Sequence, residues 1–375
     1  MSADPSFDAF FAAYKDDIVV NPNIEIRYDL EYGRSIHATG VIKSNELIVS
    51  VPSAKLINQK VFPDSSIEGT EVTAQAVLAK LLAVAANDPD HPHHLFTKML
   101  PPSFDSTPLS WLISETPTPQ QVSDIELLLQ VPAAAAHVQK QKAQVLADYA
   151  ALQPEVPLAQ YVWAWLCVNS RCLYIPLTSN PLNNLTLAPV IDFLNHTDDA
   201  ERACTMTYTS QRGMAIRSTC TYAPGDEIYI TYGPHCNQFL LCEYGFALPG
   251  NSHDFIDISD AMPLSPHKLA QLDALGYKDE YTVSDADGPS FRTTVALVAA
   301  TLQPDWEGAE PPRLLKLLVE GIITEDRFAK ETSRLLAEIL QKKAREWKAL
   351  EQRASNSGLK SMLKNWVLIA EKYSM

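Results

Sequence analysis

The alternation of apolar and polar residues predicts short strands near the start of the chain. Within residues 18–57, Ile24-Glu25-Ile26 follows the two-residue period of a strand. An apolar run at 47–51 forms a second candidate, which ends at Pro52. We therefore expect a block of β-structure here.

The pattern changes to helical spacing over residues 71–168. Apolar side chains recur every three or four positions in its first segment, at Val77, Leu78, Leu81, Leu82 and Ala85. Pro-rich stretches follow this helix. The later helix candidates cover residues 123–130, 133–151 and 157–168.

Residues 170–250 return to strands and turns, and the chain becomes helical again from about residue 263. The strand candidates of this second block are 204–208, 213–218 and 227–232. The longest helix candidate covers residues 325–352, with helical spacing of Leu336, Leu340, Trp347 and Leu350.

These blocks predict an α+β fold in which a helical insertion interrupts one β-rich domain. The insertion is expected at residues 71–168, between the two parts of the β domain at 1–70 and 169–250. Residues 251–375 are expected to form a separate helical domain.

Composition narrows the class of protein. Hydrophobic residues make up 46% of the chain, enough for a sizeable core. The net charge of −15 argues against nucleic acid and anionic membranes as direct partners and suits a basic, lysine-containing protein segment. The same charge can also serve solubility alone.

Targeting and metal signals are missing from the sequence. No apolar run approaches the ~20 residues that span a bilayer, and the first residues lack a signal-peptide pattern. We expect a cytoplasmic or nuclear protein whose six cysteines are free thiols. No Cys-x-x-Cys pair occurs, and the Pro-rich 88–94 loop with its histidines contains no cysteine, so we expect no metal.

The candidate chemistry lies in short motifs that follow one another along the chain. In order, they are Glu31-Tyr32-Gly33-Arg34, Asn169-Ser170-Arg171, Asp192-x-x-Asn195-His196, Tyr232-Gly233-x-x-x-Asn237 and Glu243-Tyr244-Gly245-Phe246. Each motif alone is a weak signal, but the complete set in this order is specific.

This ordered set resembles the SET-domain protein methyltransferases, specifically the branch similar to the Rubisco large-subunit lysine methyltransferase. The resemblance covers residues 20–250 by motif, and the rest by length and helical character. It implies a β-rich SET domain with a helical insertion, a helical C-terminal substrate-binding domain, and close packing of the Asn-His and Tyr-Gly segments. It also implies S-adenosylmethionine as cofactor and a lysine of a non-histone protein, such as a ribosomal protein or elongation factor, as methyl acceptor.

The resemblance implies a role for each motif residue. Tyr232 would be the catalytic tyrosine, with its hydroxyl near both the methyl group and the target nitrogen. The residues that bind the cofactor would be Tyr32, Gly33, Arg34, Ser170, Arg171, Asn195, His196 and Tyr232. The residues that line the lysine channel would be Asp192, Ile230, Tyr244 and Phe246.

Two positions depart from the family pattern. The first glycine motif usually reads Gly-Arg-Gly, and here Ser35 replaces the second glycine, which leaves the backbone path open. Thr197 replaces the serine that often follows Asn-His and keeps its hydroxyl.

The reaction explains why these residue types suit a methyltransferase. The cofactor brings its own leaving group, so the protein mainly binds, aligns and excludes water. A lysine must react as the neutral amine although its free pKa is about 10.4. An aromatic channel disfavours the ammonium by desolvation and tolerates a cation on its ring faces.

Other interpretations stay open. Tyr232 and Tyr244 also suit a β-core, Arg171 an ion pair, and Asp192 a turn cap. Asp226 and Glu227 follow a Pro-Gly turn and are expected to be solvated. For the whole protein, the alternatives are a histidine methyltransferase of the same family and an inactive SET fold that serves as a binding module.

Overall fold

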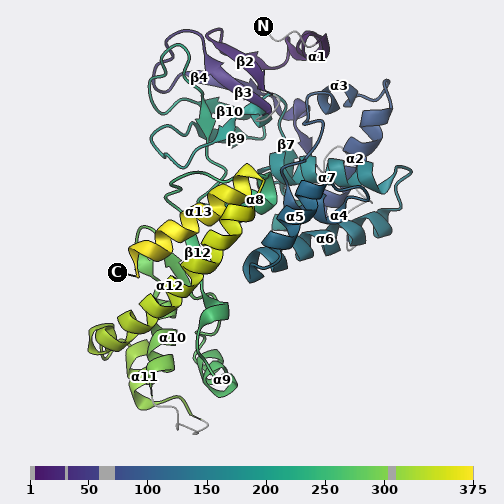
Figure 1. The fold of residues 1–375 in the computed structure, drawn as a ribbon. Helices are drawn as coiled ribbons and strands as arrows, with labels where there is room; N and C mark the ends of the chain where they lie inside the picture. Colours follow the sequence, from purple (N-terminus) through teal and green to yellow (C-terminus); the bar gives the residue numbers. More distant parts are fainter. Residues whose placement is uncertain (1–4, 30–32, 59–71, 303–309, 375) are drawn as a thin grey trace. The chain divides into compact units, whose positions relative to one another are not determined.

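The computed structural model describes residues 5–29, 33–58, 72–302 and 310–374 (Figure 1). Its contacts divide the chain into two compact units, of which the first comprises Met1–Ser114 and Gln139–Pro234 and the second Glu115–Val138 and His235–Met375. The domain boundaries expected from the sequence are a different division and stay a prediction.

The main sheet of the first unit combines strands from both predicted β blocks. Its antiparallel order is β1-β4-β10-β9, with bounds Val19–Val20, Leu47–Val51, Gly213–Arg217 and Thr205–Thr209. Strand β4 precedes the helical segment and β10 follows it. The prediction that helices interrupt one β-rich domain is therefore confirmed.

The described residues of the first unit also form three smaller sheets. They are β2-β3 (Ile24–Asp29, Gly33–Ala38), β5-β7-β6 (Ile57–Asn58, Leu185–Leu187, Leu173–Tyr174) and β8-β11 (Asn195–His196, Tyr229–Ile230). Backbone hydrogen bonds join β3 to the segment before β11, since Ile228 N donates to Ile36 O at 2.8 Å.

The helices of the first unit come mainly from the predicted insertion. They are α1 (Pro5–Tyr14), α2 (Ala74–Asn87), α3 (His94–Thr97), α4 (Pro108–Ile113) and α7 (Leu158–Arg171), and α6 (Pro132–Leu152) enters this unit at Gln139. Short 3₁₀ turns lie at Ser53–Lys55, Pro181–Asn183 and Ile191–Phe193 (η4).

Helix α2 shows why the predicted apolar stripe folds as it does. The Thr73 hydroxyl caps its first turn by accepting from Ala76 N at 3.1 Å. The helix then buries Val77, Leu78 and Leu82, as the spacing predicted. It packs along α7, whose C-terminal end carries Ser170 and Arg171.

The second unit is mainly helical, as predicted. Besides the start of α6, its helices are α5 (Pro119–Leu128), α8 (Asn237–Tyr244), α9 (Pro266–Ala274), α10 (Phe291–Thr301), α11 (Arg313–Val319), α12 (Ala329–Arg353) and α13 (Ser357–Lys372), with 3₁₀ turns at Ser259–Ala261 (η5) and Glu325–Phe328. Helices α12 and α13 lie side by side (Figure 1), and the ring centroids of Trp347 and Trp366 are 5.3 Å apart between them.

The second unit also contains a small antiparallel sheet that the sequence pattern did not predict. Its order is β12-β13-β14, with bounds Phe255–Asp257, Thr282–Ser284 and Gly288–Pro289. Strand β13 buries only Val283, opposite Ile256 of β12. One buried residue gives no two-residue period, so the pattern in this stretch favoured helices alone.

Asp124 of α5 explains why part of the insertion groups with the C-terminal helices. Its carboxylate is 3% exposed and accepts hydrogen bonds from the backbone of Ser355 at 2.7 Å and Asn356 at 2.9 Å. Both donors lie between α12 and α13. A charged acceptor that satisfies two buried N–H groups holds α5 against that turn.

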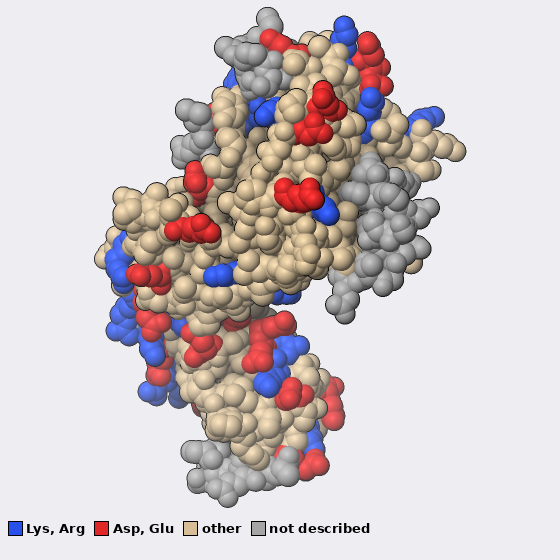
Figure 2. All heavy atoms as spheres, turned by 90° about the vertical axis from the view of Figure 1, so that its right-hand side faces the viewer, with Lys and Arg blue, Asp and Glu red and all other residues tan. Residues whose placement is uncertain are grey.

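The surface and the cysteines agree with the composition. All six cysteines are free thiols, as predicted. Among the described residues, no helix has the length and apolar character to cross a membrane. On the face drawn in Figure 2, acidic and basic side chains are scattered over a mainly uncharged surface.

Candidate active site

The Asn-His and Tyr-Gly motifs meet in a parallel pair of strands. Asn195 lies opposite Tyr229, and His196 lies opposite Ile230. The pairing continues where Thr197 N donates to Ile230 O at 3.0 Å. The close packing that the resemblance implied is therefore present, and Tyr232 lies two residues after the end of the paired strand.

His196 and Tyr232 contact each other through both backbone and ring. The backbone N–H of Tyr232 donates to Nδ1 of His196 at 3.1 Å, and the two rings stack with centroids 5.1 Å apart. Because Nδ1 accepts this bond, it carries no proton, and the ring is neutral with its hydrogen on Nε2. His196 is 7% exposed, so it serves as a rigid support for Tyr232.

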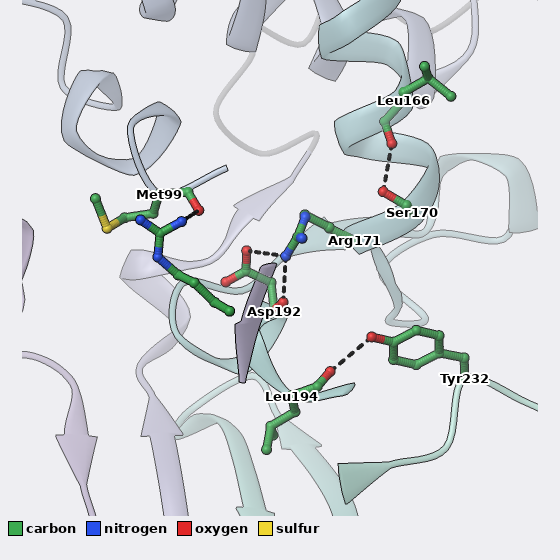
Figure 3. Close-up of polar contacts among 8 residues, drawn as sticks. Met99, Leu166, Ser170, Arg171, Asp192, Leu194 and Tyr232 are labelled. Atoms are coloured by element: carbon green, nitrogen blue, oxygen red, sulfur yellow. Dashed lines mark hydrogen bonds and ion pairs between the residues drawn. The ribbon is translucent and has the colours of Figure 1, made fainter. Parts of the chain in front are cut away.

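The hydroxyl of Tyr232 donates to the carbonyl oxygen of Leu194 at 2.9 Å (Figure 3). Tyr232 is half-buried, whereas the fully buried tyrosines of this chain include Tyr161 and Tyr222. Because the hydroxyl acts as the donor in this bond, its oxygen can in addition act as a hydrogen-bond acceptor. Tyr232 is therefore less buried than these core tyrosines, and its catalytic role stays a prediction.

Glu227 joins the two paired strands through its carboxylate. Oε1 accepts from Asn195 Nδ2 at 2.8 Å, and Oε2 accepts from the Tyr229 hydroxyl at 2.9 Å. Burial, followed by this bond, raises the pKa of Tyr229 to about 12. The prediction that Glu227 is solvated was therefore wrong, and the shared strand face of Glu227 and Tyr229 was the signal for it.

A second cluster forms around a buried ion pair. Arg171 Nη1 donates to the carbonyl oxygen of Asp192 at 2.7 Å and lies 3.4 Å from its Oδ2 (Figure 3). The side chain of Asp192 is 0% exposed, and that of Arg171 is 19% exposed. The ion-pair interpretation of Arg171 is confirmed, and Asp192 uses its side chain in that pair.

The electrostatics of Asp192 reflect this burial. Desolvation raises its pKa to about 6, although the guanidinium groups of Arg171 and Arg34 act in the opposite direction. Asp192 Oδ1 and Arg171 Nε are buried and have no hydrogen-bond partner among the described residues. The pair thus offers one acceptor and one donor to a bound group.

The backbone before Asp192 is strained. Val190 has φ +72° and ψ −41°, a region that β-branched residues avoid, and it is 1% exposed. It precedes η4, whose first turn closes when Phe193 N donates to Val190 O at 3.1 Å. The surrounding packing therefore holds this turn, and with it Asp192, in one conformation.

Arg34 lies in the same cluster. It is 9% exposed, and its Nη1 donates to the carbonyl oxygen of Met99 at 2.7 Å. Its guanidinium also lies over the rings of Phe193 at 5.6 Å and Tyr28 at 5.1 Å. Arg34, Arg171 and Asp192 therefore come together from three separate predicted motifs.

The glycine motif adopts the path that the family pattern left open. Gly33 has φ +77°, which favours glycine, and begins β3. Ser35 lies in regular strand opposite Arg27. A second glycine is therefore not required for the backbone at position 35.

The remaining predicted residues divide into three cases. The Ser170 hydroxyl donates to Leu166 O at 2.8 Å within its own helix (Figure 3). Tyr32 lies outside the described residues. Tyr244 and Phe246 belong to the second unit, where their ring centroids are 6.1 Å apart. Over the described part of the chain, no three His, Cys, Asp or Glu side chains gather as a metal site would need.

The fold and these clusters agree with a match to a known family. The SET-domain model matches residues 33–233, more than half of the chain. The chain belongs to the SET-domain family. The resemblance inferred from the motifs is therefore confirmed. The second unit of this SET-domain protein matches the C-terminal domain model of ribosomal lysine N-methyltransferase 2 over residues 254–373.

Individual relatives of this SET-domain protein point in the same direction. It is 30% identical to ribosomal lysine N-methyltransferase set11 of Schizosaccharomyces pombe, over 76% of this chain and 72% of the relative. It is 29% identical to ribosomal lysine N-methyltransferase 2 of Saccharomyces cerevisiae, over 57% of this chain and about half, 48%, of the relative. The solved structure of Rubisco LSMT bound to AdoMet shares its fold, with a TM-score of 0.64, 18% identity, and coverage of 99% of this chain and 92% of that one.

Proposed function

We propose that this SET-domain protein is an S-adenosylmethionine-dependent protein-lysine N-methyltransferase that acts on a non-histone protein. The observation that carries the proposal is the position of Tyr232. The pairing of strands β8 and β11 brings its ring into a stack with His196, and its hydroxyl donates a hydrogen bond to the carbonyl oxygen of Leu194. This arrangement fixes one phenol oxygen beside two motifs that lie far apart in the sequence.

The described residues fit the cofactor. S-adenosylmethionine ends in an amino acid with an ammonium and a carboxylate, and the buried Asp192 Oδ1 and Arg171 Nε, which lack a hydrogen-bond partner among the described residues, would supply the complementary acceptor and donor. With Arg34, Ser170, Asn195 and His196, they form the set that would hold it. When bound, S-adenosylmethionine supplies an electrophilic methyl group on a positively charged sulfur.

The protein's own groups then perform three tasks. The Tyr232 hydroxyl donates its hydrogen bond to the carbonyl oxygen of Leu194, so the phenol oxygen can act as an acceptor on its other side. Such an oxygen accepts from polarised C–H bonds. The carbonyls of Asp192 and Ile230 add further acceptors beside the lysine. The rings of Tyr244 and Phe246 would exclude water from the lysine and favour its neutral amine.

The substrate that we propose is a ribosomal protein with a basic, lysine-containing segment. Support comes from the names of the relatives and of the C-terminal family model, both of which refer to ribosomal lysine N-methyltransferases. The net charge of −15 would steer a basic segment toward the protein. We place this activity in the cytoplasm or nucleus, where ribosomal proteins are made and assembled.

The test is transfer of radiolabelled methyl groups from S-adenosylmethionine into a lysate of cells that lack this protein, followed by mass spectrometry of each labelled band. The variant Tyr232→Phe removes only the hydroxyl, and Tyr208→Phe removes a hydroxyl from β9, outside the site. We expect one main band, labelled on lysine, that disappears with Tyr232→Phe and persists with Tyr208→Phe.

Other outcomes would redirect the proposal. Label on histidine would replace lysine with the histidine alternative. Cofactor binding without any label, in a lysate that contains ribosomal proteins, would favour the binding-module alternative. Equal labelling by Tyr232→Phe would remove the catalytic role of this tyrosine.

A further inference from the structure

The second unit contains a cavity of about 500 Å³, and none of the described residues of the candidate active site lines it. Its walls come from the start of α6, from α8, from the β12–η5 segment and from α12 and α13. Its main polar and aromatic lining residues are Gln130, Asp257, Asp260, Glu346, Trp347 and Trp366. A cavity of this size can accept a long side chain together with part of its backbone.

One wall of the cavity already holds a lysine ammonium. Lys343 is 7% exposed, and its Nζ lies 2.5 Å from Asp260 Oδ2 and 3.6 Å from Glu346 Oε2. The same nitrogen lies 5.7 Å from the centroid of the Trp347 ring. Carboxylates and an indole face are the groups that bind a partly desolvated cation.

Two acidic residues of the cavity keep carboxylate oxygens that accept no hydrogen bond from the described residues. Asp257 uses Oδ1 to accept from Ser259 N and Oγ, and its Oδ2 makes no hydrogen bond with the described residues. Glu346, whose side chain is 47% exposed, likewise accepts no hydrogen bond from them. Both carboxylates thus keep acceptor oxygens for a second cation.

The charge count of the lining residues points the same way. Asp257, Asp260 and Glu346 face two basic residues, Lys343 and Arg353. The cavity therefore has one excess negative charge beside two tryptophans, within a chain of net charge −15. An acidic occupant would meet repulsion there, whereas a basic one meets complementary charge.

We propose that this cavity binds a lysine or arginine side chain from a basic segment of the substrate protein, as a docking site distinct from the lysine that is methylated. The proposal rests on the proposed function for the identity of the partner. The cation-binding chemistry itself rests on the carboxylates of Asp257 and Glu346, which line the cavity beside Trp347.

A peptide-binding experiment tests the proposal without any catalysis. The probe is a fluorescein-labelled Gly-Ser peptide with several spaced lysines, and fluorescence anisotropy measures its affinity without cofactor. The test variant is Glu346→Lys, and Glu338→Lys is the matched control, because it makes the same charge change at an exposed position of α12 that does not line the cavity. We expect Glu346→Lys to weaken binding about fivefold or more and Glu338→Lys to change it less than about twofold.

A second variant separates shape from charge. Ala349 is exposed and lines the cavity, so Ala349→Phe fills space without altering any charge. Circular dichroism checks that both variants fold. We expect Ala349→Phe to weaken the lysine peptide as well. Equal effects of Glu346→Lys and Glu338→Lys, or tighter binding of a glutamate peptide, would overturn the proposal.

The two proposals can fail separately. Because the peptide assay omits the cofactor, a protein that labels no substrate can still show the cavity-dependent difference. Conversely, normal labelling of lysine combined with unchanged peptide binding in Glu346→Lys and Ala349→Phe would leave the enzyme in place and remove only the docking site.

Discussion

The side-chain amide of Asn195 donates a hydrogen bond of 2.8 Å to the carboxylate of Glu227, across the parallel pair β8 and β11. The second oxygen of this carboxylate accepts from Tyr229. Glu227 therefore fixes Asn195 to the strand that leads into Tyr232. Its expected role is to position the cofactor-binding residue and the catalytic residue relative to each other.

We predict that Glu227→Ala lowers both S-adenosylmethionine affinity and kcat/KM about tenfold, because two hydrogen bonds to one carboxylate are lost. Glu227→Gln should recover most of both, since its amide oxygen can accept from Asn195 while its NH₂ group donates to the Tyr229 oxygen. Calorimetric titration and steady-state kinetics measure the two effects. Asp226→Ala is the control, because Asp226 only caps its own turn at Ala223 N.

Asp192 predicts opposite pH responses of stability and activity. Its pKa of about 6 lies above the usual value of 3.8, so the folded protein binds this proton more tightly than the unfolded chain. The free energy of unfolding should therefore rise by about 1–3 kcal/mol as pH falls from 7 toward 4. Activity should fall over the same range, because protonated Asp192 loses its ion pair with Arg171.

Urea unfolding at pH 7 and pH 5 checks this prediction. Asp254 contributes to the same stability change, because burial raises its pKa to about 6 as well. Asp192→Asn should remove part of the pH dependence of stability, and Asp254→Asn should remove another part. An unchanged pH profile in Asp192→Asn would show that its carboxylate does not titrate in this range.

The glycine motif gives a paired stability prediction. Gly33→Ala should lower the free energy of unfolding by about 1 kcal/mol, because an L side chain resists φ +77°. Among the described residues other than its chain neighbours, no atom lies within 4 Å of the added Cβ, so the expected loss is attributed to backbone strain. Ser35→Gly restores the family pattern, but it should also lower the free energy of unfolding, by about 0.5–1 kcal/mol, because glycine weakens a strand. We expect no gain in activity. Chemical unfolding of both variants compares them directly.

Asp124 predicts a large loss of stability at a residue far from any proposed chemistry. Asp124→Ala leaves the backbone N–H groups of Ser355 and Asn356 without their acceptor, which should cost about 2–4 kcal/mol. Glu126→Ala, an exposed change on the same helix, should stay within about 0.5 kcal/mol. Thermal unfolding measures both, and similar losses would show that Asp124 does not secure α5.

The sequence predicted the fold wherever a regular period reported burial. Helices α2 and α12 bury the positions that helical spacing indicated, and the two β blocks pair with each other as expected. Strand β13 was missed, because its single buried residue, Val283, carries no period. Its stability comes from partners on β12 and β14, which local sequence does not report.

The site was predictable to the extent that motifs encode it. Order along the chain identified the residues that gather around Tyr232 and around Asp192. It did not reveal Glu227, whose partners Asn195 and Tyr229 become neighbours only through the parallel pairing. Likewise, the carbonyl acceptors on Met99 and Leu194 belong to the backbone and leave no mark in the sequence.

The division of the chain into two compact units limits how the protein can be dissected. The polypeptide passes between them at 114–115, 138–139 and 234–235, and the middle passage lies inside α6. A fragment that ends near residue 234 would keep α5 but lose Ser355 and Asn356, the donors to Asp124. The segment that matches the SET-domain model therefore does not contain all the contacts of its own helices. A single proteolytic cut cannot release either unit whole, because each unit consists of two chain segments.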